Sequence, residues 1–415
     1  MRTLEAALAG VDAASLARDV AALVQVPSVT GDERAALERL AELAAGLGLA
    51  ADLHRHDLAA LRAHPGHPGE EAAREELWGL TVTLPGARDD GPRLALDGHV
   101  DVVPEGTAPW RHGPWSGAIE DGDVWGRGSV DMKGSVVAAL HALAALGVRA
   151  PHGEVVLVAV GSEEDGGLGT FAALDRDDRF DACLVPEPTG FDVVCAQAGA
   201  LTFEGILHGV SAHAAHRLEG VSAIDRYVAV HAALAEHERA VNAAVEHPLM
   251  HELELPYPLV VGRLRAGEWS SSVPDRLVFE GRAPVPVGED PAAARAAVEA
   301  AVRAAAGDDG AVELRWPGGQ FAPGETPAGH PFARTVAAAM SAELGRPARM
   351  AGVPWGADMR LWCARGIPCV MAGPRGIERS HAVDERVRID DLVTVARAIV
   401  RVAWTASSRP PRLAA

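Results

Sequence analysis

Lysine is almost absent from this chain, and basic residues as a whole are scarce. Lys133 is the single lysine among 38 basic residues, which face 57 acidic ones, so the net charge is −19. A chain this acidic repels phosphate backbones and anionic lipid, and no basic patch interrupts the sequence. We therefore expect neither a nucleic-acid partner nor a membrane-surface partner.

Cysteine is also rare, and its spacing excludes a disulfide framework. The chain contains no CxxC pair, and its thiols lie mostly in apolar runs: Cys183, Cys195, Cys363 and Cys369. Such a pattern predicts buried free thiols in a reducing cytoplasm.

Long apolar runs are missing as well. The longest, at about 136–148, is interrupted by His141 and falls short of the ~20 residues that a membrane helix needs. Glu5 and Asp12 near the start break the cation-then-apolar layout of a signal peptide. We expect a cytoplasmic protein.

The 415 residues exceed one usual core, so the length predicts two domains or one domain with a large insertion. Apolar runs near 78–86, 93–103, 153–164 and 180–190 alternate with helical stretches, which predicts an α/β fold with a mostly parallel sheet covered on both faces. The pattern then changes to strand–helix–strand–strand–helix, typical of a smaller α+β insertion with helices on one face of its sheet. We predict domains at 1–198, 199–309 and 310–415, the first and last forming one catalytic domain.

A histidine-rich segment follows the first helices. It contains His54, His56, His64 and His67. Its proline and glycine content and irregular spacing favour a solvated loop over a metal site.

Potential metal ligands follow several of the predicted strands. His99 and Asp101 end one strand, Glu163 and Glu164 follow another, and Glu187 follows a third. Asp131 lies where a glycine-rich loop enters a helix, and His381 follows the last core strand. Each residue alone has an ordinary explanation, such as a solvated loop or a turn. Because ligands bind outside the carboxyl ends of strands in open α/β sheets, together they predict a site for two Zn²⁺-like ions.

Six motifs carry a family resemblance, in the same order along the chain: GHVDVVPEG, GRGSVDMKG, SEEDGGLG, PEPT, GVSAHA and SHAVDE. They resemble the amidohydrolase family that includes acetylornithine deacetylase, succinyl-diaminopimelate desuccinylase, aminoacylases and glutamate carboxypeptidase. The resemblance extends from about Val26 to Ile399. It implies a zinc-hydrolase catalytic domain with an inserted ferredoxin-like lid or dimerisation domain.

The resemblance also implies the metal ligands. His99, Asp131 and Glu187 would hold one zinc, and Asp131, Glu164 and His381 the other, with Asp131 as the bridge. A cis peptide after Asp131 is frequent in the family.

The same resemblance, together with the chemistry of amide hydrolysis, implies roles for two further carboxylates. Glu163 would be the general base, because a carboxylate must move a proton from the attacking water to the leaving amine. Asp101 would accept the free N–H of the His99 ring and fix its tautomer, unless it only caps the loop before Pro104.

Within the insertion, His213 matches a family histidine that reaches the partner subunit's active site and hydrogen-bonds the developing oxyanion. A surface histidine beside His216 is the ordinary alternative. Arg282 is the candidate for gripping a substrate carboxylate, although an arginine-rich chain offers many others. Ser272 stands where many relatives have asparagine before Val-Pro, which changes the hydrogen bonding around the substrate.

The resulting prediction is a cytoplasmic, homodimeric hydrolase with two Zn²⁺, or Co²⁺ in their place, that cleaves the amide bond of an N-acyl amino acid. A metallo di- or tripeptidase or carboxypeptidase of the same family is the main alternative, because both types share the metal cage. A catalytically silent binding relative is the alternative of another class, but it would be expected to lack the base or a ligand.

Overall fold

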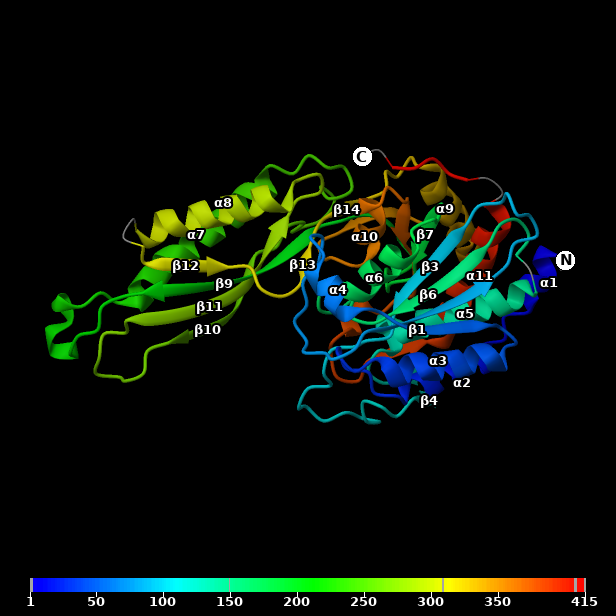
Figure 1. Cartoon of the computed structure of the whole chain (residues 1–415), viewed down its shortest axis with the longest axis horizontal. Coiled ribbons are helices and arrows are strands. Elements are labelled where there is room, and N and C mark those ends of the chain that lie inside the picture. Colours follow the sequence, from blue (N-terminus) through cyan, green and yellow to red (C-terminus); the bar gives the residue numbers. More distant parts are fainter. Residues whose placement is uncertain (1–2, 149, 308–309, 407–408, 414–415) are drawn as a thin grey trace. The chain divides into compact units, whose positions relative to one another are not determined.

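The computed structural model of the chain describes residues 3–148, 150–307, 310–406 and 409–413 (Figure 1). The chain divides into two compact units. Unit 1 comprises Met1–Cys195, Glu325–Ala351 and Ala357–Ala415, and unit 2 comprises Ala196–Gly324 and Gly352–Gly356.

The larger sheet is mixed, with parallel strands at its centre. Its strands are β1 (Ala51–Arg55), β2 (Trp78–Leu84), β3 (Leu94–His99), β6 (Val155–Val160), β7 (Ala182–Val185), β8 (Val193–Gln197), β14 (Gly324–Glu325), β15 (Met350–Val353) and β16 (Cys369–Met371). The order is β1-β2-β6-β3-β7-β16-β8-β14, with β15 paired to β8. β3 is parallel to β6 and β7, and β16 is parallel to β7, whereas β1 and β2 are antiparallel additions. Every residue of β3 and β6 is buried, as interior parallel strands require.

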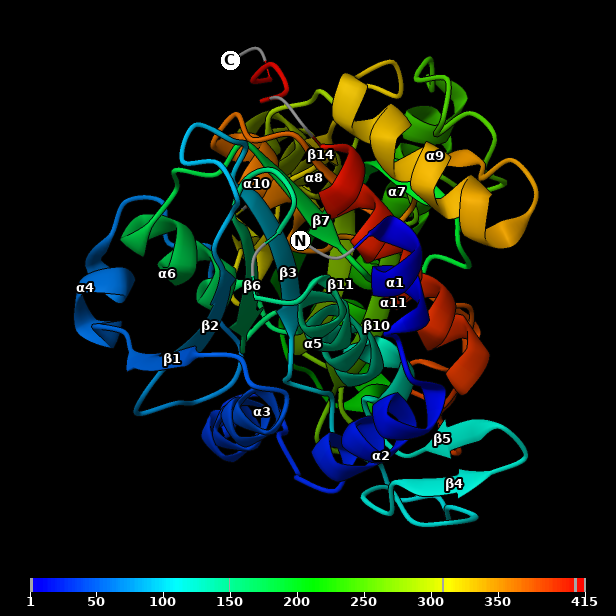
Figure 2. The same cartoon turned by 90° about the vertical axis from the view of Figure 1, so that its right-hand side faces the viewer.

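Helices cover both faces of this sheet. They are α1 (Leu4–Ala9), α2 (Ala13–Val24), α3 (Arg34–Gly46), α4 (Leu58–Ala63), α5 (Gly134–Leu146), α6 (Leu168–Arg176), α9 (Pro331–Leu344), α10 (Met359–Ala364) and α11 (Ile389–Thr405). Figure 2 shows α4 and α6 on one side of the central strands and α5 and α11 on the other. The arrangement confirms the predicted α/β class with a mostly parallel sheet.

The helix α5 is the central core helix of unit 1. By length and apolar composition the window Ser129–Leu146 is the one candidate for a membrane span among the described residues, yet 89 % of it is buried inside the structure. It packs on β3, β6 and α11. Its uniformly apolar surface is therefore explained by burial on all sides.

A small antiparallel sheet, which the sequence did not predict, joins two distant loops. It consists of β4 (Ala118–Glu120), β5 (Asp123–Trp125) and β17 (Arg386–Arg388), in the order β17-β5-β4. Arg386 pairs with Trp125 and Val387 with Val124. This pairing holds the segment that follows His381 beside the glycine-rich loop that precedes Asp131.

Unit 2 is an α+β structure. Its strands are β9 (Gly199–His208), β10 (Val260–Ala266), β11 (Arg276–Val285), β12 (Val312–Arg315) and β13 (Gln320–Phe321), and its helices are α7 (Ala223–Ala243) and α8 (Pro291–Ala306). The antiparallel order is β10-β11-β9-β12, with β13 also on β9. Both helices lie on one face (Figure 1), over a core that includes Phe203, Leu207, Phe279, Val230 and Val298. The predicted α+β insertion with one covered face is confirmed.

The first part of the histidine-rich segment differs from the predicted solvated loop, whereas His64 and His67 lie in the loop that follows α4. His54 lies within β1, paired with Gly79 of β2, and the backbone N–H of His56 extends the ladder to Leu77. Asp57 then caps α4 by accepting the N–H of Ala60 at 3.1 Å. Pairing along the sheet edge outweighed the local polarity that suggested a loop.

Candidate metal centre

The ends of three neighbouring strands bring the predicted ligands of unit 1 together. His99 is the last residue of β3 and pairs with Val160, the last residue of β6. Glu163 and Glu164 follow β6 by three and four residues, and Glu187 follows the end of β7 by two. Because these strands are parallel, their carboxyl ends meet at one edge of the sheet.

Asp131 and His381 reach the same edge from loops. Asp131 lies in the short turn Ser129–Lys133 before α5, where the Asp131–Met132 peptide is cis, as the family resemblance implied. His381 follows the turn Ile377–Arg379 and has a positive φ of 62°. Its side chain is 53 % exposed, while the other ligand candidates are buried or nearly so.

Two groups of donor atoms share Asp131. In the first, His99 Nε2 lies 3.2 Å from Asp131 Oδ1 and 3.7 Å from Glu187 Oε1. In the second, His381 Nε2 lies 3.2 Å from Glu164 Oε1 and 3.6 Å from Asp131 Oδ2. Within each group one atom per residue lies within 4.8 Å of the others. Bonds of about 2.0–2.2 Å to one tetrahedral ion separate its ligands by roughly these distances, so the donors fit a metal ion.

The charges of this cluster favour cations. Burial, and next the Asp131 carboxylate, raise the pKa of Glu187 well above its ordinary value. Burial opposes the ionisation of Asp131, but hydrogen bonds with His381 and His99 hold the pKa of that carboxyl below its usual range. Hydrogen bonds to Asp131 and Glu164 raise the pKa of His381 to about 10. Buried carboxylates crowded in this way repel one another when ionised, and divalent cations would stabilise their ionised forms.

Glu163 is buried beside this cluster but belongs to neither group of donor atoms among the described residues. Burial raises the pKa of Glu163 well above its ordinary value, and the carboxylates of Asp358, Glu187 and Glu164 act in the same direction against His99. The side chain can hold a proton close to the metal ligands without being one.

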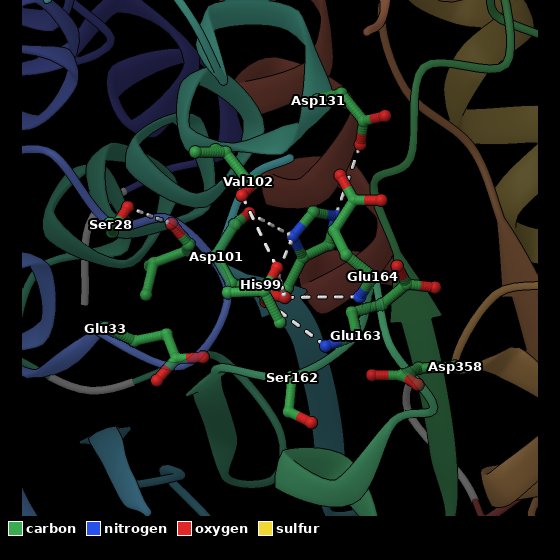
Figure 3. A network of polar contacts seen from close by, with 12 residues as sticks. Ser28, Glu33, His99, Asp101, Val102, Asp131, Ser162, Glu163, Glu164 and Asp358 are labelled. Atoms are coloured by element: carbon green, nitrogen blue, oxygen red, sulfur yellow. Dashed lines mark hydrogen bonds and ion pairs between the residues drawn. The ribbon is translucent and has the colours of Figure 1, made fainter. Parts of the chain in front are cut away.

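Asp101 organises both the imidazole and the glutamate loop (Figure 3). His99 Nδ1 lies 2.9 Å from the backbone oxygen of Asp101 and 3.4 Å from its carboxylate Oδ1, so the backbone oxygen is the nearer acceptor. The Asp101 carboxylate also accepts the backbone N–H groups of Glu163 and Glu164, each at 3.2 Å. The sequence predicted contact of Asp101 with the imidazole, or a cap of the loop before Pro104, but not its hydrogen bonds to the glutamate loop.

The sequence analysis did not identify Glu385 and Arg127 as residues of the site. Glu385 Oε1 accepts the backbone N–H groups of Val130 at 3.1 Å and Asp131 at 3.3 Å, and Arg127 Nη1 donates to Glu385 Oε2 at 2.7 Å. Both side chains are buried. The one available signal was that Glu385 ends the SHAVDE motif and Arg127 lies in GRGSVDMKG.

The remaining predicted residues lie in unit 2. His213 is exposed, accepts the N–H of Ala215 at 3.1 Å and forms a β-bridge with Ser272. Ser272 is exposed too. Arg282, half-buried on β11, carries its guanidinium 5.7 Å from the ring centre of Phe321. Unit 2 thus brings His213 and Ser272 together on neighbouring segments.

Comparisons with known proteins agree with this geometry. Residues 95–405 match the model of the peptidase family M20/M25/M40. A succinyl-diaminopimelate desuccinylase of Methylobacterium nodulans is 37 % identical over 213 residues, which cover 48 % of this chain and 50 % of that relative. In this alignment the chain spans about half the length of its relative. A protein of the same name from Methylobacterium sp. (strain 4-46) is 31 % identical over 412 residues, covering 94 % of this chain and 96 % of the relative.

Solved structures share the fold. An aminopeptidase PepT from Bacillus cereus has a TM-score of 0.70 at 22 % identity, covering 96 % of this chain and 100 % of that one. A metallo-carboxypeptidase of the M20 family from Sulfolobus solfataricus has a TM-score of 0.74 at 16 % identity, covering 94 % and 98 %. Fold and donor set together define an α/β protein with a candidate centre for metal ions. The chain belongs to the peptidase family M20/M25/M40.

Proposed function

We propose that the chain hydrolyses the amide bond of an N-acyl amino acid at a site that binds two zinc ions. The observation that carries the proposal is the pair of donor groups joined by Asp131, with Glu163 buried beside them. The relatives named succinyl-diaminopimelate desuccinylase, one of them similar over nearly the whole chain, favour a deacylase.

The roles of the residues follow from their positions. His99, Asp131 and Glu187 hold one ion, and Asp131, Glu164 and His381 the other. When bound, the ions supply an activated water and polarise the scissile carbonyl. Glu163 takes the proton of the attacking water and returns it to the leaving nitrogen. Asp101 fixes the His99 ring and the backbone of the glutamate loop.

Unit 2 supplies substrate recognition and dimerisation in this proposal. His213 stabilises the oxyanion in the partner subunit's site, Arg282 binds the substrate carboxylate, and Ser272 borders the substrate. Exposed apolar side chains on α7 (Ile224 and Val228) and on the edge strand β10 (Val260 and Leu264) support a homodimer through this unit. The predicted domain limits and cytoplasmic location stay predictions.

A substrate panel tests the activity. We expect the protein, loaded with Zn²⁺ or Co²⁺, to hydrolyse N-succinyl or N-acetyl amino acids with a higher kcat/KM than di- or tripeptides. A preference for peptides would establish the peptidase alternative instead. Inertness towards every acyl amino acid and peptide, with metal bound, would favour the silent binding relative.

A further inference from the structure

The loop 161–166, which carries both glutamates of the candidate site, is held from a second side by a buried carboxylate. Asp165 Oδ2 accepts a hydrogen bond from Arg74 Nη2 at 2.7 Å and the backbone N–H groups of Glu71 and Ala72 at 3.1 and 2.8 Å. Its Oδ1 accepts the hydroxyl of Ser162. Asp165 therefore ties the glutamate loop to the segment 71–74, which the proposed reaction does not use.

Ser162 binds this anchor through its hydroxyl and directly precedes Glu163 in the chain; Figure 3 shows Ser162 and Glu163. It has a φ of 67°, in the left-handed region that residues other than glycine rarely adopt. Its carbonyl accepts the N–H of Gly167 at 2.6 Å, and its hydroxyl binds Asp165. The backbone direction at which Glu163 leaves the turn is therefore set by the contacts of Ser162.

Arg74 is the cation on which Asp165 depends. Its side chain is 0 % exposed, and its guanidinium lies 3.5 Å from Glu33 Oε1 and 3.5 Å from Glu70 Oε2 as well as 2.7 Å from Asp165. One buried guanidinium thus lies against three carboxylates. Without Arg74, Asp165 would keep its hydrogen bonds to Ser162 and to the backbone but would lose the one cation that lies against it among the described residues, so its position depends on Arg74.

We propose that Arg74 is a positioning residue for hydrolysis, which fixes Asp165 and Ser162 and through them aims Glu163 at the reacting water. The inference rests on the proposed role of Glu163. Among the described residues, the guanidinium of Arg74 pairs with Glu33, Glu70 and Asp165, none of which is a donor of the metal centre, so its effect passes through the loop. A displacement of a proton-transfer group by about 1 Å costs on the order of 100-fold in rate.

The test is Arg74→Met, with Arg93→Met as the matched control. Arg93 also forms ion pairs with two carboxylates, Glu154 and Asp177. It directly precedes β3, at the end of the strand opposite to His99. We expect Arg74→Met to lower kcat about 10- to 100-fold with KM changed less than about 2-fold and with the metal content retained. Arg93→Met should leave kcat unchanged, and Arg74→Lys should recover part of the loss.

A double-mutant cycle identifies the route of the effect. If Arg74 acts through Asp165, the Arg74→Met/Asp165→Asn double variant loses no more kcat than the more affected single variant. Ser162→Ala removes only a hydroxyl and tests the same route if Arg74→Met does not fold. We expect this variant to lower kcat about 5- to 10-fold at unchanged metal content.

The outcomes separate this inference from the proposed function. A wild-type protein without activity would contradict the proposed function. If the wild type is active and both Arg74→Met and Ser162→Ala have the kcat of the wild type, the positioning role alone is overturned. A loss of kcat that only parallels a loss of bound metal would overturn it as well.

Discussion

Glu163 and Glu164 are neighbours in the chain, but their contacts assign them different tasks. Glu164 lies 3.2 Å from His381 in a donor group, whereas Glu163 is in neither group. We expect Glu163→Gln to keep the metal and to lower kcat roughly 10²- to 10⁴-fold, because a glutamine side chain cannot accept the proton of the attacking water. Glu164→Gln should lose metal. Elemental analysis and kcat on the best substrate measure both effects, and metal loss in Glu163→Gln would make it a ligand.

Glu385 offers a second test at this scale. Its carboxylate holds the backbone of Val130 and Asp131, so Glu385→Gln removes one acceptor and leaves Arg127 buried without its charge partner. We expect a metal affinity about 10- to 100-fold lower, as for other residues that orient metal ligands. Chelator competition measures the affinity. The control is Glu378→Gln, an exposed residue of the same loop; an equal change in both variants would contradict the idea.

The sequence was sufficient to name the residues that the structure brings together, but not the contacts that orient them. His99, Glu163 and Glu187 follow apolar runs, and that pattern is visible without a fold. The anchors Glu385, Arg74 and Asp165 lie in loops. Arg74 and Asp165 are 91 residues apart, and Glu385 is 258 residues from Arg127. Local composition carries no information on such pairs. The roles of the site residues, His213, Ser272 and Arg282 among them, stay predictions.

At the scale of elements, periodicity located the long helices and the buried strands, and failed for short or edge elements. β6 is a fully apolar run and β3 begins with one, α8 and α11 have helical periodicity, and α7 is a long stretch without proline or glycine. β4, β5 and β17 have three residues each, too few for a pattern to be distinguished from a loop. β1 is exposed along most of its length, so its strand conformation depends on pairing with β2.

The end of β1 also makes stability depend on pH. Burial, with His54 and Arg176 nearby, lowers the pKa of His56 to about 4, against an ordinary value near 6.5. The unfolded chain binds a proton below about pH 6.5 and the folded chain only near pH 4. The free energy of unfolding should therefore fall between pH 6.5 and 4, by at most about 3 kcal/mol from this residue.

Urea unfolding at several pH values measures this effect. His56→Gln should be less sensitive than the wild type over that range, while His231→Gln, an exposed histidine on α7, should keep the wild-type slope. The same slope in His56→Gln and wild type would show that His56 does not contribute.

At the scale of the whole molecule, the proposed homodimer makes each active site depend on two chains. His213→Ala should lower kcat without changing the metal content, since His213 belongs to neither donor group in the described part of the chain. Mixing inactive Glu163→Gln with His213→Ala, under conditions that exchange subunits, should then restore activity. Random exchange makes half of the dimers mixed, and each mixed dimer has one complete site, so roughly a quarter of wild-type activity is expected.

A control mixture shows whether complementation between subunits causes the restored activity. Glu163→Gln and Glu164→Gln alter the same subunit's part of the site, so their mixture cannot assemble a complete one and should remain inactive. Leu264→Asp, on the edge strand β10, should shift the wild-type dimer towards monomer in sedimentation, because the exposed leucine would be buried in the proposed interface. If the monomer retains full activity, His213 does not act across subunits, and the oxyanion must be stabilised from within one chain.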